Sequence, residues 1–385
     1  MNRRVFFNYL AAAAAGIAGI MLMDESLIRK VWYRLEGMFK PSVKLPADGE
    51  RGEAALPSDG KAVSVEKALN SRCNSDNDDN PMNFHWGMFD GGKKLSEEQV
   101  KGIIGQARIP RFTDGRVEIR HETNVLSFVI DNRTSGSKRD WMMVESGMQQ
   151  QAICLVCAAG GIGMVFSGQG KDGTGLSEED LMTLKALVDP MKPSYERAFW
   201  SSATPMGTKG WQTGNLPDPV RDGGKALLAC LSEVRTAAES GKKATWESVS
   251  QLLWAARGRT PHYYKSTPWG MTIPVWTGKQ DTCSVYLISR GKLFEYVNWD
   301  RGRPTHALQE LGEINDMRLG ERTGVVLGKN EETGKALWEV GYQLLNMLVQ
   351  AHSLGISYES KLLDETSRKG FDHPSLKNPV AILML

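Results

Sequence analysis

Residues 338–357 read WEVGYQLLNMLVQAHSLGIS and carry almost no charge. Apolar positions recur at helical spacing around most of the circumference, which predicts a buried helix built on Leu337, Gly341, Leu344, Leu345, Leu348, Ala351 and Leu354. The polar residues are three or four positions apart, so they form one stripe of Glu339, Gln343, Asn346 and Gln350. Buried amides need partners. These side chains therefore either bond one another and nearby backbone or face a ligand.

A second copy of this stretch lies upstream, at residues 144–164, VESGMQQQAICLVCAAGGIGM. Placing Gly147 on Gly341 puts Gln151 on Leu345, Ala152 on Asn346 and Gly161 on Gly355. Two further pairs of segments match in the same order. LSEEQVKGIIGQAR at 95–108 matches ATWESVSQLLWAAR at 244–257, and residues 59–74 match residues 222–236. Matches in one order predict a divergent tandem repeat.

Length and composition place the chain among globular proteins. Its 385 residues are enough for two domains of ordinary size, with 41% hydrophobic and 24% charged residues. A formal net charge of +2 argues against nucleic-acid binding, because phosphates attract concentrated basic surfaces.

The N-terminus resembles an export signal. Arg3 and Arg4 precede residues 6–23, which contain no charge. Paired arginines before an apolar segment are typical of twin-arginine signals, which direct folded and often cofactor-containing proteins across a bacterial membrane. An ordinary secretory signal and a buried N-terminal helix are the alternatives. Residues 1–23 are therefore predicted to be a signal or membrane anchor, which places the protein in the periplasm or on the outer side of the cytoplasmic membrane.

Residues 24–58 read as an amphipathic stalk helix followed by a Pro- and Gly-containing linker. Repeat one is predicted at 59–192, a second linker at 193–221 and repeat two at 222–385. Helices are expected at 64–71, 96–108, 176–187, 226–236 and 245–256, with weak helicity at 306–311 and a loop at 74–83. Strands are expected at 124–131, 162–166 and 378–385, with a hairpin at 284–297. The predicted fold class is α+β with a mixed sheet.

Motifs that announce a catalytic centre are missing. The sequence contains no G-x-S-x-G, no dinucleotide-binding or phosphate-binding glycine loop, and its six histidines lack metal-ligand spacing. Cys154 and Cys157 have the spacing of a redox motif, but they fall inside the predicted buried helix of repeat one. Packing is therefore favoured over metal or thiol chemistry for this pair.

The motifs that remain resemble those of the nitroreductase-like flavoenzymes. Residues 251–256, QLLWAA, with Gly258, and the run from Gly341 through Asn346 to Gly355 carry the resemblance. Within this family the chain looks most like the branch of peptide azoline dehydrogenases. The resemblance extends over residues 223–385 and, more weakly, over residues 59–166.

The resemblance implies an α+β subunit that binds FMN at an interface between two subunits. An internal pseudo-dimer of the two repeats would complete such a site within a single chain, so a monomer is expected. The family's Arg-rich phosphate motif is kept only in pieces, at Arg72 and at Arg235 with Thr236, although Arg suits phosphate because it can bond two oxygens. The remaining matching positions are Gly270 in an aromatic loop, Asn346, Gly355 and Gln151.

Several departures from the family pattern weaken the predicted site. Residues 267–270, TPWG, lack the family's Ser, and the chain has no basic residue after its last strand. Each lost charge-assisted bond costs about 1.5 to 3 kcal/mol, so two losses would weaken FMN binding roughly a hundredfold.

Three functional hypotheses follow. The first is an exported FMN-dependent oxidoreductase acting by hydride transfer on a small-molecule or peptide substrate, with no residue assigned as acid or base and no metal. The second is a catalytically silent pseudo-dimer that acts as a binding or scaffold module at the membrane. The third is a peptide-modifying dehydrogenase, which fits export poorly because such tailoring normally precedes secretion.

Overall fold

The computed structural model describes the following residues: 63–71, 74–76, 95–114, 117–122, 125–130, 135–160, 162–166, 179–186, 215–260, 270–274, 282–300, 303–314, 319–320, 322–371 and 373–385. The predicted signal or anchor, the predicted stalk, Arg72 and residues 193–214 of the predicted linker lie outside them. Among the described helices, none has the length and apolar character needed to cross a bilayer.

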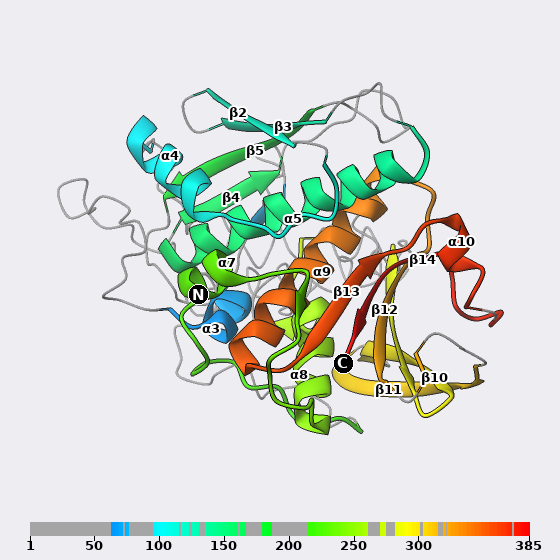
Figure 1. Cartoon of the computed structure of the whole chain (residues 1–385). Coiled ribbons are helices and arrows are strands. Elements are labelled where there is room, and N and C mark those ends of the chain that lie inside the picture. Colours follow the sequence, from blue (N-terminus) through cyan, green and yellow to red (C-terminus); the bar gives the residue numbers. More distant parts are fainter. Residues whose placement is uncertain are drawn as a thin grey trace, which may run out of the picture. The chain divides into compact units, whose positions relative to one another are not determined.

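Two long helices form the centre of the fold (Figure 1). Helix α9 (Gly334–Leu354) confirms the helix predicted from residues 338–357. The Thr333 side chain caps its start by accepting from the Ala336 N–H, and Gly355 ends it in the left-handed conformation at φ 66°. Helix α5 (Gly136–Gly160) contains most of the upstream copy at residues 144–164 and ends at Gly160. Both helices are buried from their first or second turn onward, as their sequences predict.

The two helices cross at Gly147 and Gly341. A Cβ on Gly147 would overlap the Trp338 carbonyl and lie 2.7 Å from its Cα. A Cβ on Gly341 would overlap the Val144 carbonyl and lie 2.8 Å from the Met148 nitrogen. Each glycine thus meets the residue three positions before the other glycine. The two helices therefore make the same kind of contact with each other, as the two copies do in the interface of a symmetric dimer.

A second contact of the same kind joins α3 (Val65–Ser71) to α7 (Leu227–Glu233). Ser64 and Ala226, the residues just before these helices, face each other in an antiparallel bridge. The Val65 N–H donates to the Lys225 carbonyl at 3.0 Å, and the Leu227 N–H donates to the Val63 carbonyl at 2.8 Å. Exchanging the two segments leaves this pair of bonds unchanged.

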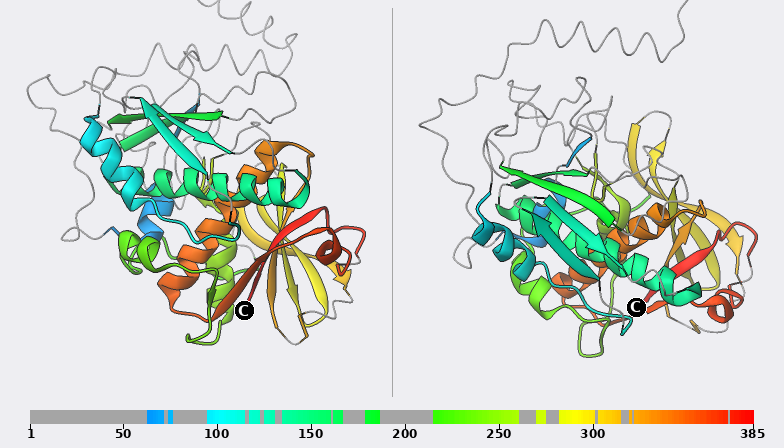
Figure 2. Two further views of the ribbon diagram at one scale, coloured as in Figure 1. Left: turned by 45° about the horizontal axis from the view of Figure 1, so that its top comes forward. Right: turned by 90° about the horizontal axis from the view of Figure 1, so that it is seen from above.

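Each long helix packs against its own sheet (Figure 2). The sheet beside α5 has the order β1-β4-β5-β3-β2, with strands β1 (Asn74–Asp76), β2 (Glu118–Glu122), β3 (Val125–Val129), β4 (Ile162–Phe166) and β5 (Glu179–Ala186). The sheet beside α9 has the order β11-β10-β9-β12-β14-β13-β6, with strands β6 (Ala237–Ala238), β9 (Cys283–Ser289), β10 (Lys292–Asp300), β11 (Arg303–Glu313), β12 (Gly324–Lys329), β13 (Tyr358–Leu362) and β14 (Pro379–Met384).

The two sheets share one order of strands. Starting from β1, the five-stranded sheet continues with the strand after α5, the next strand, and then the strand before α5. Starting from β6, the seven-stranded sheet repeats this order around α9 through β13, β14 and β12. They differ in that β1 and β4 are parallel whereas β6 and β13 are antiparallel. The molecule is therefore of the predicted α+β class, and its first sheet is mixed.

The remaining elements confirm part of the prediction. Helices α4 (Glu97–Gln106) and α8 (Trp246–Arg257) confirm the helices predicted at 96–108 and 245–256, and the side chains of Ser96 and Thr245 cap them. The predicted hairpin turns through Arg290 and Gly291, both at positive φ, between β9 and β10. The last strand, β14, also confirms its prediction. The described residues also form the short strands β7 (Arg259–Thr260) and β8 (Gly270–Met271), which pair with each other, and the short helix α10 (Glu365–Arg368).

Three predictions of local structure are wrong. The helix expected at 176–187 is strand β5, whose backbone bonds both β3 and β4. The weak helix expected at 306–311 belongs to β11, which pairs with β10 over most of its length. The loop expected at 74–83 contains β1, which pairs with β4. In each case hydrogen bonds to neighbouring strands override the local preference of the sequence, and those strands lie far away in the sequence for β1 and for the pairing of β5 with β3.

Candidate functional site

The polar stripe of α9 lies buried against α8 and its surroundings. Glu339, Gln343, Asn346 and Gln350 each have no exposed surface. At the C-terminal end of the stripe, the Gln350 amide donates to the Glu66 carboxylate at 2.6 Å and accepts from Gln251 at 3.4 Å. Glu66 also accepts from the Gly224 N–H at 2.9 Å. This end of the stripe ties α3, α8 and α9 together.

Two of the predicted site residues meet in the middle of the stripe. The Gln151 amide nitrogen, from α5, donates to the Asn346 side-chain oxygen at 2.8 Å and to the Thr272 carbonyl at 3.0 Å. The Asn346 nitrogen donates to the carbonyls of Ala255 at 2.9 Å and Thr272 at 3.2 Å. Both of its N–H groups are therefore used within the protein, and Gly270 lies two residues from this network.

The neighbouring amide atoms are not satisfied in this way. Neither side-chain atom of Gln343 has a hydrogen-bond partner in the described part of the chain, and the same holds for the side-chain oxygen of Gln151. Both residues are completely buried. Gln343 precedes Asn346 by three positions and so lies next to it on the same helix face. A buried polar group without a partner costs about 1 to 3 kcal/mol, so these atoms call for a polar partner.

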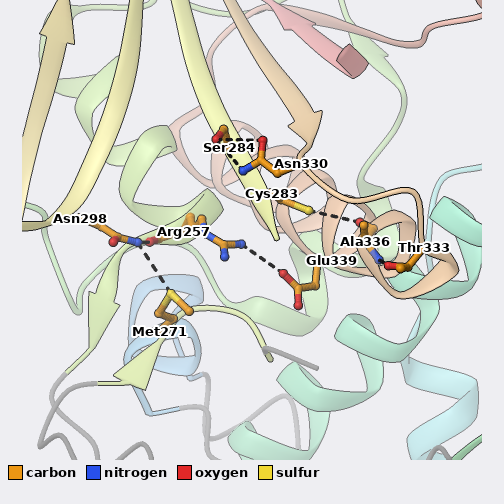
Figure 3. Close-up of polar contacts among 9 residues, drawn as sticks. All are labelled: Arg257, Met271, Cys283, Ser284, Asn298, Asn330, Thr333, Ala336 and Glu339. Atoms are coloured by element: carbon orange, nitrogen blue, oxygen red, sulfur yellow. Dashed lines mark hydrogen bonds and ion pairs between the residues drawn. The ribbon is translucent and has the colours of Figure 1, made fainter. Parts of the chain in front are cut away.

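The other end of the stripe contains a buried ion pair (Figure 3). Arg257 Nη1, at the end of α8, lies 3.4 Å from Glu339 Oε2, with side-chain exposures of 5% and 0%. Almost no solvent reaches either group, so removing one partner would take an ion-pair partner from a buried charge. Asn298 holds the end of α8 by donating to the Arg257 carbonyl at 2.6 Å.

A second buried arginine lies close by. The Arg259 guanidinium stacks 4.6 Å from the centre of the Trp299 ring and donates to Asn298 at 3.4 Å. Sequence reasoning missed both arginines. The signal that was available is the Arg-x-Arg spacing directly after the matched QLLWAA segment.

The predicted phosphate-binding residues lie in a different set of contacts. Arg235 is exposed, and its carbonyl accepts from the Tyr358 hydroxyl at 3.0 Å. The Thr236 carbonyl accepts from the Ser360 N–H at 2.8 Å. Gly355 caps α9. Among the described residues, no hydrogen bond joins these three residues to the network of Gln151 and Asn346.

A further polar cluster, also missed from sequence, surrounds His306. Ser250 Oγ donates to the Pro217 carbonyl at 2.7 Å, so it accepts from His306 Nε2, also at 2.7 Å. His306 Nδ1 then accepts from the Tyr296 hydroxyl at 2.8 Å. Burial, together with the charge of Arg221, lowers the pKa of His306 to about 4. The imidazole is therefore neutral at pH 7 and braces α8 against β10 and β11.

The cysteines behave as packing residues. Cys154 and Cys157 have no exposed surface. Burial raises the pKa of Cys157 well above its ordinary value, so the reactive thiolate is suppressed. In the described part of the chain no group of acidic, histidine or cysteine side chains is arranged to hold a metal ion.

Comparison with known proteins gives matches among solved structures alone. No protein-family model and no curated protein matches the chain. A candidate nitroreductase from Ralstonia eutropha matches with a TM-score of 0.35 and 18% identity, over 44% of this chain and 85% of that one. One from Thermotoga maritima matches with a TM-score of 0.38 and 10% identity, over 84% and 94%.

A candidate nitroreductase from Anabaena variabilis matches with a TM-score of 0.43 and 11% identity, over 67% of this chain and 68% of that one. All three of these solved structures are described as candidate nitroreductases. At these identities and TM-scores the similarity brings no cofactor or substrate with it.

Proposed function

We propose that this chain is a nitroreductase-like oxidoreductase that binds FMN beside the polar stripe of α9. The observation that carries the proposal is the set of buried amide atoms without partners on Gln343 and Gln151. The polar edge of a flavin ring presents both N–H and carbonyl groups, and a primary amide can bond to either kind. The donor set of this site therefore fits the ring.

Other residues would contribute by position. Asn346 and Gln151 hold the backbone at Thr272, which keeps the segment beginning at Gly270 against α8. Arg235 and Thr236 are proposed to bind the FMN phosphate, together with Arg72, and the exposure of Arg235 leaves its guanidinium accessible. Gly355 would allow close approach at the end of α9. Bound FMN would supply the hydride chemistry, so the chain needs only to orient it and its substrate.

We further infer that residues 59–192 and 222–385 are tandem repeats packed as an internal pseudo-dimer. The exchangeable contact between Gly147 and Gly341, the equally exchangeable bridge between Ser64 and Ala226, and the shared order of strands support this. A site that requires two subunits would then be completed within one chain.

The first experiment is to purify the full chain from its native cells, record its absorbance spectrum and identify any cofactor that it releases. We expect flavin absorption bands and release of FMN. A colourless protein that also fails to take up added FMN would contradict the proposal.

A sharper experiment compares FMN with riboflavin, which lacks the phosphate. Arg235→Gln should weaken FMN binding about tenfold or more, through loss of a charge-assisted bond, and leave riboflavin binding unchanged. Arg290→Gln, at the exposed turn between β9 and β10, is the matched control and should change neither. Equal losses for both ligands would show that Arg235 does not bind the phosphate.

We also propose export through a twin-arginine signal, on the basis of Arg3 and Arg4 and the uncharged segment after them. Replacing both arginines by lysine conserves the charge and should leave the protein in the cytoplasm. Cell fractionation of the two forms is the measurement. Unchanged export would favour an ordinary secretory signal.

The catalytically silent scaffold remains the second candidate. It is favoured by the closed network of Asn346, whose N–H groups are both used internally, and by the absence of contact between this network and Arg235 among the described residues. Failure to bind any flavin, together with a folded and stable chain, would support it.

A further inference from the structure

The central helices are related by an exchange that also pairs their side chains. With Gly147 placed on Gly341, Gln151 corresponds to Leu345 and Ala152 corresponds to Asn346. The structure joins Gln151 to Asn346 by a hydrogen bond of 2.8 Å. The exchanged positions hold Leu345 and Ala152, which are both completely buried. The side of the helix pair with Gln151 and Asn346 is therefore polar, whereas the equivalent positions on the other side are apolar.

A second pair of equivalent residues has the same residue type but different hydrogen bonding. Gln149 corresponds to Gln343, and its amide donates at 2.5 Å to the carbonyl of Ala107, at the end of α4. Gln343 lies beside α8, the helix equivalent to α4, but its amide has no partner among the described residues. The Gln149 amide, on the α4 side, thus has a backbone partner, and the Gln343 amide, on the α8 side, has none among the described residues.

The equivalent carboxylates of α5 and α9 have different partners. Glu145, equivalent to Glu339, accepts from the N–H groups of Phe112 at 2.5 Å and Thr113 at 2.7 Å, and from the Thr113 hydroxyl at 2.8 Å. The loop after α4 thus closes over Glu145. On the α8 side Glu339 faces the Arg257 side chain instead. Both carboxylates therefore have partners within the chain, and the difference between the two sides lies in the amides of Gln149 and Gln343.

We infer that only one of the two equivalent sides takes a ligand, so that the chain binds one flavin, on the side of α8. This inference rests on the proposed flavin binding and adds its number and place. Because Gln343 and Gln151 are completely covered, the ligand reaches them only after the covering chain moves. The observed rate of uptake should therefore level off as ligand concentration rises.

The first test is stoichiometry. The purified full chain, stripped of any bound cofactor, is titrated with FMN at a protein concentration well above the dissociation constant, and the quenching of flavin fluorescence is followed. We expect an end point of one FMN per chain. Two per chain would overturn the inference while supporting the proposed function, and none would overturn the proposed function itself.

The second test uses a matched pair of variants. Gln343→Leu replaces a buried amide without a partner and should weaken FMN binding about tenfold or more, through loss of one bond to the ring. Gln149→Leu alters the equivalent position on the α4 side and should leave FMN affinity unchanged. Circular dichroism of both variants checks that they fold. Loss of binding in Gln149→Leu and retention in Gln343→Leu would overturn the inference.

Discussion

At the scale of single residues, Gln343 is a polar side chain in a fully buried position. Its amide is completely buried within an apolar helix pair and has no partner among the described residues. The equivalent Gln149 satisfies its amide nitrogen on the Ala107 carbonyl. Two glutamines at matching positions therefore have opposite effects on stability.

This contrast predicts opposite effects of one substitution on the chain without flavin. Gln343→Leu should raise the free energy of unfolding by about 1 kcal/mol, because it removes an unsatisfied buried amide. Gln149→Leu should lower it by about 1 kcal/mol, because the Ala107 carbonyl loses its donor. Urea denaturation of both variants measures the difference. A loss of stability in Gln343→Leu would mean that the amide has a partner in the folded protein.

His306 predicts the dependence of stability on pH. Its pKa is about 4 in the folded protein against 6.5 for the unperturbed group, so between these values the unfolded chain binds the proton more readily. Stability should therefore fall as pH decreases from 6.5 to 4, by about 3 kcal/mol.

His306→Gln removes the titrating group and should flatten the pH dependence of the urea midpoint in this range. His373→Gln, at a half-buried histidine elsewhere, is the control that keeps His306. A slope that persists in His306→Gln would assign the acid sensitivity to other groups.

At the scale of elements, the crossing of α5 and α9 depends on two glycines. Their periodic apolar faces made both helices predictable, whereas β5 was missed because its partner β3 lies about 50 residues upstream. Strand β11 was missed although its partner β10 directly precedes it, because residues 306–311 have only a weak local preference for helix. The close approach itself leaves no room for a side chain at either Gly147 or Gly341.

The crossing predicts equal sensitivity at its two glycines. Gly147→Ala and Gly341→Ala should each lower the free energy of unfolding by about 2 kcal/mol or more, because the new Cβ overlaps backbone of the other helix. Gly105→Ala in α4 is the control, since nothing lies within 4 Å of its Cβ position. It should be neutral or stabilise by up to about 1 kcal/mol. Thermal unfolding of the three variants measures these changes in stability. If Gly147→Ala and Gly341→Ala were as stable as Gly105→Ala, the crossing would accept a side chain and the prediction would be wrong.

At the scale of the whole molecule, α5 contacts α9, and the residues just before α3 and α7 contact each other, all within one chain. Under the proposed internal pseudo-dimer these surfaces of the described residues are used within the chain and are not open to a second copy. The full chain should therefore be monomeric in solution. Light scattering after size-exclusion chromatography should give the mass of one chain, and a dimer mass would show that another surface associates.

Sequence alone determined the buried helix at α9, the helices α4 and α8, and the terminal strand. These features follow from periodicity and capping, which act over a few residues. Only the tertiary structure decided which buried amides are satisfied. Gln151 and Asn346 are 195 positions apart, and Gln149 and Gln343 share a residue type but not a partner. Whether a polar atom is satisfied depends on the segment that packs against it, and distant parts of the chain supply that segment.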